Sequence, residues 1–388
     1  MHRMVNVVQP YAWGSREALA ALRGEPPTPG PEAELWMGAH PLAPSRLEVD
    51  GALCPLDELI ARAPGLWLGA DLAARFGGRL PFLLKVLAAA EPLSLQAHPS
   101  RERAAARFAA EERAGVPLGA PHRGYKDPNH KPEILCALTR FEALYGFRDV
   151  AGTVSLLRAL ETPALGGLLQ RLTEPVPLRA TVAHLFGLAE PERTALVAAV
   201  VEACARAPAG WEAETRWALR MAAAYPGDVG VVVALLMNLV RLEPGEALYL
   251  PAGNLHAYLE GTGVELMANS DNVLRGGLTR KHVDVPELME VLDFSPVPPH
   301  PLRAERAGPE WVYRTTAEDF RLSRLEEGPT AALPGEGAQI LLCTRGRAEL
   351  RRGEVTLVLR QGESAFVPAG WAPVQVRNEG QLFRATSG

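Results

Sequence analysis

Lysine is scarce in this chain. All but four of its 40 basic residues are arginine, and the lysines are Lys85, Lys126, Lys131 and Lys281. On a solvated surface arginine can replace lysine freely, so lysine persists most readily where a compact ammonium is needed and a planar guanidinium does not fit. All four lysines fall inside motif-like segments, and we expect Lys131 in particular to have a function.

Cysteine is also sparse, with no C-x-x-C pair among the four scattered residues Cys54, Cys136, Cys204 and Cys343. This spacing argues against a cysteine zinc site and for reduced thiols in a cytosol. The N-terminal segment lacks the apolar core of a signal peptide. The longest apolar run, residues 230–240, contains Asn238 and is too short to span a bilayer. We therefore expect a cytoplasmic protein without a membrane partner.

Clusters of positive charge are missing as well. The net charge is -5, and no run of Lys and Arg could follow a phosphate backbone, so we expect no nucleic-acid partner. The length of 388 residues, with 47% hydrophobic and 22% charged residues, describes a globular protein of two or three domains.

The most informative stretch covers residues 241–281. An alternating strand ends at the turn Pro251-Ala252-Gly253, and the next strand begins with His256 and Tyr258 on one face. Glycine, proline, glycine and histidine at this spacing are typical of the hairpin of a cupin-type jelly roll. One histidine does not make a metal site, so the rest of the chain must supply partners.

Two upstream segments place polar groups at alternate strand positions. The apolar strand 80–87 carries Lys85 in its middle, where a lysine needs an anionic partner or a shifted pKa. In the next segment Ser94, Gln96 and His98 share one face. Both segments therefore offer candidate site residues.

A different pattern fills residues 150–240, where leucine and alanine recur at helical spacing with few β-branched residues. We predict an all-helical insert between two β segments, with residues 231–240 as helix and His184 as a structural residue.

The chain also repeats itself. Residues 362–373 align without gaps on residues 245–256 and keep the strand, the glycine and the proline–glycine turn, but Pro373 replaces His256. This predicts a second jelly roll without the ligand position.

Together these patterns predict a mainly β protein with two cupin-type jelly rolls and a helical domain. We expect a catalytic jelly roll made of two parts, residues 1–149 and 241–300. The helical insert covers residues 150–240, and a degenerate jelly roll covers residues 301–388.

Four residues on three predicted strands suit one metal ion, with the first two on the same strand: Gln96, His98, Glu133 and His256. Two imidazoles, a carboxylate and an amide oxygen fit a borderline divalent cation such as zinc, with a position left for water or substrate. Glu133 also shares a strand face with Lys131, two residues before it. The pattern alone leaves open that these residues are unrelated in space.

The segments LPFLLKVL, LSLQAHPS, YKDPNHKPE, PAGNLHAY and VELMANSDNVLRGGLT, in this order and around this helical insert, resemble type I phosphomannose isomerases. The resemblance spans about residues 10–290 and implies one zinc ion per chain, held by the same Gln96, His98, Glu133 and His256. It also implies interconversion of mannose 6-phosphate and fructose 6-phosphate through a cis-enediol. That reaction needs a Lewis acid, a base and a cationic clamp for the phosphate.

The resemblance places Arg275 beside the substrate carbons, with Glu265, Lys131 and Tyr258 in the same pocket. The identity of the base stays open: Glu265 is the plainest choice, and Lys131 would need a depressed pKa. Arg275 remains protonated in nearly any environment, so electrostatic stabilisation is its expected role.

The remaining candidates concern the two ends of the sugar. Ser94, Lys85 and Lys281 are the candidates for the phosphate, and Trp13 and Glu34 for the sugar end. Many relatives have proline before the lysine that corresponds to Lys281. This chain has Arg280 at that position. The change weakens the argument that Lys281 binds the phosphate, and it adds a second cation that could do so.

Three alternatives stay open: a cupin oxygenase that uses iron, a non-catalytic sugar-phosphate-binding protein, and an isomerase of another, even unphosphorylated, sugar. A glutamine ligand is unusual for the oxygenase and leaves the lysines unexplained. The intact set of Lys131, Glu265 and Arg275 disfavours the binding protein. The expected partner is a small sugar phosphate, and the expected state is a monomer.

Overall fold

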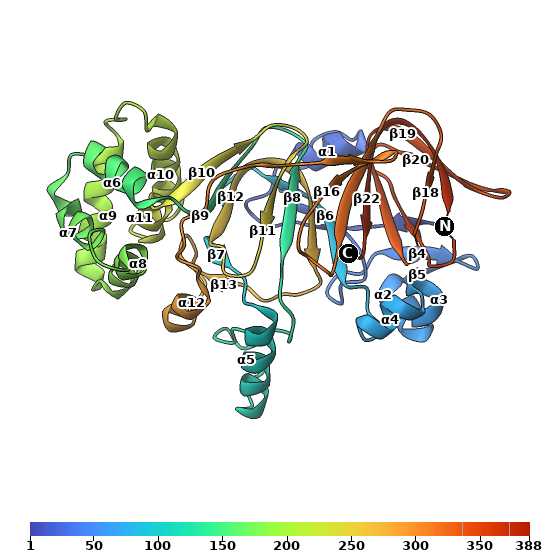
Figure 1. Ribbon diagram of the computed structural model, residues 1–388, viewed down its shortest axis with the longest axis horizontal. Coiled ribbons are helices and arrows are strands. Elements are labelled where there is room, and N and C mark those ends of the chain that lie inside the picture. Colours follow the sequence, from blue (N-terminus) through green and yellow to red (C-terminus); the bar gives the residue numbers. More distant parts are fainter. Residues whose placement is uncertain (336, 372) are drawn as a thin grey trace.

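The computed structural model describes residues 1–335, 337–371 and 373–388. It is an elongated molecule in which a helical segment, a central β barrel and a C-terminal β barrel follow one another along the long axis (Figure 1). Two antiparallel sheets of 11 strands each form the barrels. The prediction of a mainly β, cupin-type protein with a helical insert is confirmed.

The central sheet joins strands that lie far apart in the sequence. Its long strand β12 pairs with β6, β7, β8 and β9, so that strand is the hub of the sheet. The strands are β2 (Val7–Gln9), β3 (Glu34–Met37), β6 (Phe82–Ala89), β7 (Gln96–Ala97), β8 (Glu133–Ala137), β9 (Phe141–Phe147), β10 (Met237–Leu242), β11 (Glu246–Leu250), β12 (His256–Ala268), β13 (Leu274–Arg275) and β14 (Leu302–Arg303).

A register shift inside β12 decides which side chains share a face. Strict alternation from His256 and Tyr258 would turn Glu265 to the opposite face. The pairing with β9 shifts between Tyr258 and Glu260, however, and a bulge of this kind exchanges the two faces of a strand. Tyr258 and Glu265 therefore line the same cavity.

The helical segment forms a bundle at one end of the molecule, and its core is continuous with barrel residues such as Leu144 and Leu259 (Figure 1). Its core combines leucines of several helices with Trp217 and Met221. The helices are α6 (Val150–Ala159), the short 3-10 helix η1 (Pro163–Leu165), α7 (Gly166–Arg171), α8 (Pro177–Gly187), α9 (Glu190–Cys204), α10 (Glu212–Ala224) and α11 (Gly230–Ala234).

The predicted end of this segment is wrong. Helix α11 stops at Ala234, and residues 237–242 form strand β10, which pairs with β9 from Met237↔Phe147 to Leu242↔Phe141. An apolar run of this length fits either a helix or a buried strand, and the open edge of β9 selects the strand.

The C-terminal sheet contains strands from both ends of the chain. Its strands are β1 (His2–Val5), β4 (Arg46–Val49), β5 (Ala52–Pro55), β15 (Glu305–Ala307), β16 (Glu310–Tyr313), β17 (Arg321–Glu326), β18 (Ala331–Leu333), β19 (Gln339–Arg352), β20 (Val355–Arg360), β21 (Ser364–Val367) and β22 (Val374–Thr386). β1 pairs with β21 and β4. The expectation that all of residues 1–149 join the catalytic barrel is therefore wrong for β1, β4 and β5, because edge pairing depends on distant partners.

The internal repeat has the same backbone form in both copies. β11 and β21 are each preceded by a glycine with positive φ, Gly245 at 90° and Gly362 at 82°, and each is followed by a turn with Gly253 at 81° or Gly370 at 76°. A side chain at such φ values is strained, which explains why glycine occupies these positions in both copies. Pro373 of the second copy is exposed.

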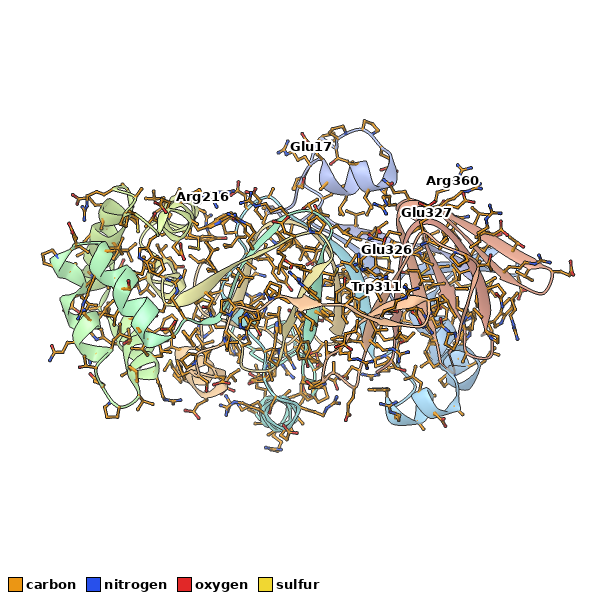
Figure 2. All side chains as sticks on the ribbon, turned by 45° about the horizontal axis from the view of Figure 1, so that its top comes forward. Glu17, Arg216, Trp311, Glu326, Glu327 and Arg360 are labelled. Atoms are coloured by element: carbon orange, nitrogen blue, oxygen red, sulfur yellow. The ribbon has the colours of Figure 1, made fainter. Side chains whose placement is uncertain are left out.

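The other helices lie around the barrels: α1 (Ala18–Arg23), α2 (Leu56–Arg62), α3 (Pro64–Leu68), α4 (Ala70–Arg75), α5 (Arg101–Arg113) and α12 (Val285–Val291). Ser100 caps the N-terminus of α5, because its hydroxyl oxygen accepts from Arg103 N at 3.3 Å. None of the helices in the described residues has the length and apolar character needed to cross a membrane. Figure 2 shows Arg216 on the helical segment and Arg360 on the C-terminal strands, on opposite sides of the central barrel.

Candidate metal centre and active site

Three predicted metal ligands meet at the ends of neighbouring strands of the central barrel. His98 follows β7, Glu133 begins β8 and His256 begins β12. Glu133 Oε2 lies 3.3 Å from His98 Nε2 and 3.4 Å from His256 Nε2. The possible ligand atoms of all three residues lie within 4.8 Å of one another, and all three residues are buried.

The backbone fixes the orientation of both imidazoles. His98 Nδ1 lies 2.8 Å from the Asn272 carbonyl oxygen, and His256 Nδ1 lies 3.0 Å from that of Asn254. A carbonyl can only accept, so each Nδ1 donates a proton, and Nε2 is the ring atom of each histidine that faces Glu133.

This donor set fits a divalent metal ion. His98 Nε2, Glu133 Oε2 and His256 Nε2 are buried and make no hydrogen bond in the described part of the chain. Such unpaired buried atoms are costly unless something binds them. Gln96, the fourth candidate, lies opposite His256 in the β7–β12 pairing and lines the cavity. Two nitrogens and a carboxylate with an open position suit zinc.

Electrostatics favour the protonation states that a metal needs. Burial lowers the pKa of His98 to about 4, although the charge of Glu133 opposes the shift. Burial acts to raise the pKa of Glu133, but the charge of Lys131 and contacts with His98 and His256 outweigh it and hold that pKa well below its usual range. At neutral pH His98 is therefore an unprotonated ligand and Glu133 a carboxylate.

A second buried charge cluster lies beside the metal ligands. Lys85 Nζ is 3.0 Å from Glu265 Oε2 and 3.5 Å from Glu34 Oε2. Trp36 Nε1 donates to Glu34 Oε2 at 2.6 Å, and Lys131 Nζ pairs with Glu133 Oε1 at 2.8 Å. The buried lysine of the apolar strand thus has the anionic partners that the sequence demanded.

These neighbours also set the charges of the cluster. Burial acts to lower the pKa of Lys85, but the carboxylates of Glu265 and Glu34 outweigh it and shift that pKa upward. Burial raises the pKa of Glu265, against the opposing charge of Lys85. Burial and the nearby Glu265 charge raise the pKa of Tyr258 well above its usual value, so its hydroxyl stays protonated.

A cavity of about 1100 Å³ opens above these residues. Its walls contain the predicted catalytic and substrate-binding residues: Trp13, Glu34, Lys85, Ser94, Lys131, Tyr258, Glu265, Arg275 and Lys281. Gln96 and Glu133 reach its floor. The sites suggested by separate motifs therefore form one continuous chamber large enough for a sugar phosphate.

Positive charge gathers on the wall nearest the helical segment, where Arg275, Arg280 and Lys281 line the cavity together with Arg220 of α10. The charge of Arg275, with burial, lowers the pKa of Lys281. Two cations that repel each other in this way mark a place where an anion is stabilising.

Comparison with known proteins agrees with this arrangement. The chain matches the model for the catalytic domain of type I phosphomannose isomerase over residues 1–150, and that for the cupin domain of mannose-6-phosphate isomerase over residues 312–387. It is 41% identical over 397 residues to the mannose-6-phosphate isomerase of Escherichia coli (strain K12), with 99% of each chain covered. The chain belongs to the type I phosphomannose isomerase family.

More distant members of this family and its solved structures also resemble the chain over nearly its whole length. The Bos taurus mannose-6-phosphate isomerase is 32% identical over 418 residues, covering 97% of this chain and 91% of that protein. A crystal structure of a zinc-bound mannose 6-phosphate isomerase has a TM-score of 0.92 at 40% identity, covering 100% of this chain and 99% of the other. A mutant phosphomannose isomerase from Salmonella typhimurium has a TM-score of 0.94, with the same identity and coverage.

The phosphomannose isomerase cavity also contains residues that the sequence did not single out: Tyr11, His40, Arg220, Tyr225 and Asp271. His40 is buried, and its Nε2 lies 3.3 Å from Asp271 Oδ1. Asp271 lies inside the NSDN motif, so the motif could have drawn attention to it. Arg220 lies in a helix of ordinary amphipathic pattern, where nothing in the sequence separates it from a surface arginine.

Proposed function

We propose that this chain is a zinc-dependent mannose-6-phosphate isomerase, which interconverts mannose 6-phosphate and fructose 6-phosphate. The observation that carries the proposal is a chamber that reaches the His98–Glu133–His256 cluster through Glu133 and is also lined by Arg275, Arg280 and Lys281. The full-length similarity to enzymes of that name supports it.

The chemistry needs a proton moved between two neighbouring carbons while charge develops on their oxygens. Bound zinc supplies a Lewis acid for that charge. Glu265 is the proposed base, because its pKa is raised toward the range where a carboxylate exchanges protons efficiently. Lys85 holds this carboxylate in place at 3.0 Å, and Tyr258 offers a protonated hydroxyl to a sugar oxygen.

Lys131 is better suited to positioning than to proton abstraction. Its ammonium pairs with Glu133 at 2.8 Å, which keeps the carboxylate of that ligand ionised. Arg275, with no carboxylate partner among the described ion pairs, supplies positive charge beside the reacting carbons.

For the phosphate we propose the basic wall. Arg280 and Lys281 adjoin Arg275 there, and Ser94 lines the same chamber. Lys85, the other early candidate, is already paired with two carboxylates and belongs instead to the proton-transfer cluster. Trp13 and Glu34 also line the chamber and are proposed to contact the sugar end.

We further propose a monomer of the cytoplasm that acts on a small sugar phosphate, with the sequence-based divisions as its domains except for the strands reassigned above. All four cysteines are free, as expected in a reducing compartment.

The function is tested by an activity assay with mannose 6-phosphate that detects fructose 6-phosphate, before chelation, after chelation and after zinc is added back. We expect activity to disappear on chelation and to return with zinc. Absence of turnover with the metal fully bound would contradict the isomerase, and turnover of unphosphorylated sugars at equal efficiency would favour an isomerase of another sugar.

Replacement of Arg275 by alanine should leave zinc bound but lower kcat/KM by about 10²–10³-fold, the usual cost of removing one group that stabilises transition-state charge. Steady-state kinetics and metal analysis on one preparation check this. Arg216→Ala is the matched control, because Arg216 pairs with Glu142 outside the chamber at 2.9 Å (Figure 2). Wild-type kinetics for the Arg275 variant would refute its role.

A further inference from the structure

Two sequence motifs contain polar residues that the proposed reaction does not use. The side chain of Asn272 does not line the catalytic chamber, although its neighbours Asp271 and Val273 do. It is 1% exposed. A buried carboxamide is costly unless all its polar groups are bonded, so its partners should reveal what it holds.

All the partners of that carboxamide lie on one loop. Asn272 Oδ1 accepts from Lys126 N at 2.7 Å, and Nδ2 donates to the carbonyl oxygens of Asp127 at 2.7 Å and Asn129 at 2.8 Å. This loop leads directly into Lys131 and Glu133. One side chain therefore holds the loop that leads into the strand with the carboxylate ligand.

The loop also contributes a side chain, Asp127, that bonds back to the segment of Asn272. Asp127 accepts from the Ser270 hydroxyl through Oδ1 at 2.8 Å and from Asp271 N through Oδ2 at 2.8 Å. The two segments are thus joined in both directions by a clip that consists of Asp127, Ser270 and Asn272. Reciprocal bonding of this kind holds two loops in one relative position.

The same residue reaches the metal site by a second route. The Asn272 carbonyl oxygen accepts the Nδ1 proton of His98 at 2.8 Å and so fixes the direction of its Nε2 lone pair. Asn272 also precedes Arg275 by three residues. It contacts one ligand directly, and another ligand through the loop.

We propose that Asn272 is the positioning residue of the metal centre, and that the clip sets zinc affinity by holding His98 and Glu133 in register. The inference rests on the proposed zinc-dependent function, but its principal measurement does not require turnover.

The test measures zinc affinity by competition with a chromophoric chelator for wild type, Asn272→Ala and a matched control, Asn378→Ala. Asn378 is a buried asparagine of the C-terminal barrel whose Nδ2 donates to the carbonyl oxygens of Leu325 and Gly380. Asn272→Ala keeps the backbone carbonyl that faces His98 but removes the carboxamide that holds the loop before Glu133. We expect about 10–100-fold weaker zinc binding, the usual range when support outside the ligands is lost, and wild-type affinity for Asn378→Ala.

Ser270→Ala keeps the test decisive if Asn272→Ala does not fold. It removes one donor to Asp127 and leaves the carboxamide, and it should weaken zinc binding to a smaller extent. Wild-type zinc affinity in every folded clip variant, with only a lowered Tm, would overturn the inference. Weaker zinc binding in a protein that never isomerises mannose 6-phosphate would retain the clip and overturn the function instead.

Discussion

Replacement of His256 by alanine is expected to abolish both zinc binding and turnover. His256 supplies one of three buried ligand atoms within 4.8 Å, and its ring is directed by the Asn254 carbonyl. With one imidazole gone, a single nitrogen ligand remains beside the oxygens of Glu133 and Gln96, a donor set much less suited to zinc. Metal analysis after dialysis and the isomerase assay with excess zinc check both losses.

The control for this variant is His184→Ala. His184 lies on α8 in the helical bundle, away from the chamber, and its replacement should leave zinc content and kinetics unchanged. Full activity of the His256 variant with stoichiometric zinc would show that the metal lies elsewhere. Restoration by excess zinc alone would show that His256 contributes affinity and not the site itself.

Glu265→Gln is expected to lower kcat by about 10²–10⁴-fold, the range that a positioned general base contributes. The substitution keeps the size of the side chain and removes the group that exchanges the proton. Zinc content should stay at the wild-type level, because Glu265 is not among the ligand atoms. Loss of zinc together with activity would point to a structural role.

The pH profile gives an independent readout of the same carboxylate. Burial raises the pKa of Glu265, and the base is active only when ionised. The rate should therefore fall as pH drops through this raised pKa, at a higher pH than an ordinary glutamate near about 4.3 would give. The acid limb should disappear from the residual activity of Glu265→Gln. An unchanged limb would assign it to another group.

Glu265→Gln removes the buried charge partner of Lys85 and so affects stability as well as catalysis. It therefore needs a control variant that loses a similar buried ion pair. Glu310 pairs with Arg384 at 2.8 Å inside the C-terminal barrel, as Glu265 pairs with Lys85. Glu310→Gln breaks a comparable buried pair far from the chamber. It should lower Tm in a thermal melt without changing kcat.

Local sequence was sufficient to predict the parts of the site that depend on short turns. The Pro251–Gly253 turn places His256 at the start of its strand, because a glycine with positive φ ends one strand and the next begins within three residues. Alternation likewise brought Ser94 and Gln96 to the chamber wall. In both segments the geometry is set within a few residues.

Other features depend on partners distant in sequence. The bulge that turns Glu265 into the chamber arises from pairing with β9, and the basic wall gains Arg220 only because the helical bundle packs against the barrel. Lys131 precedes β8 and does not lie on it, since Pro132 cannot donate to a strand ladder, yet its ammonium still reaches Glu133. No local pattern contains this information.

The pairing of β1 with β21 has a consequence for how the chain acquires its structure. His2 lies opposite Phe366, so a contact of very high sequence separation closes the C-terminal sheet. Contacts of this kind form slowly, because a long loop must close before they contribute. During synthesis β1 can pair with β4 early, but its residues that face β21 must wait, unpaired, until nearly the whole chain has emerged. An exposed strand edge at that stage invites association between nascent chains, so aggregation during translation is the characteristic risk of this topology.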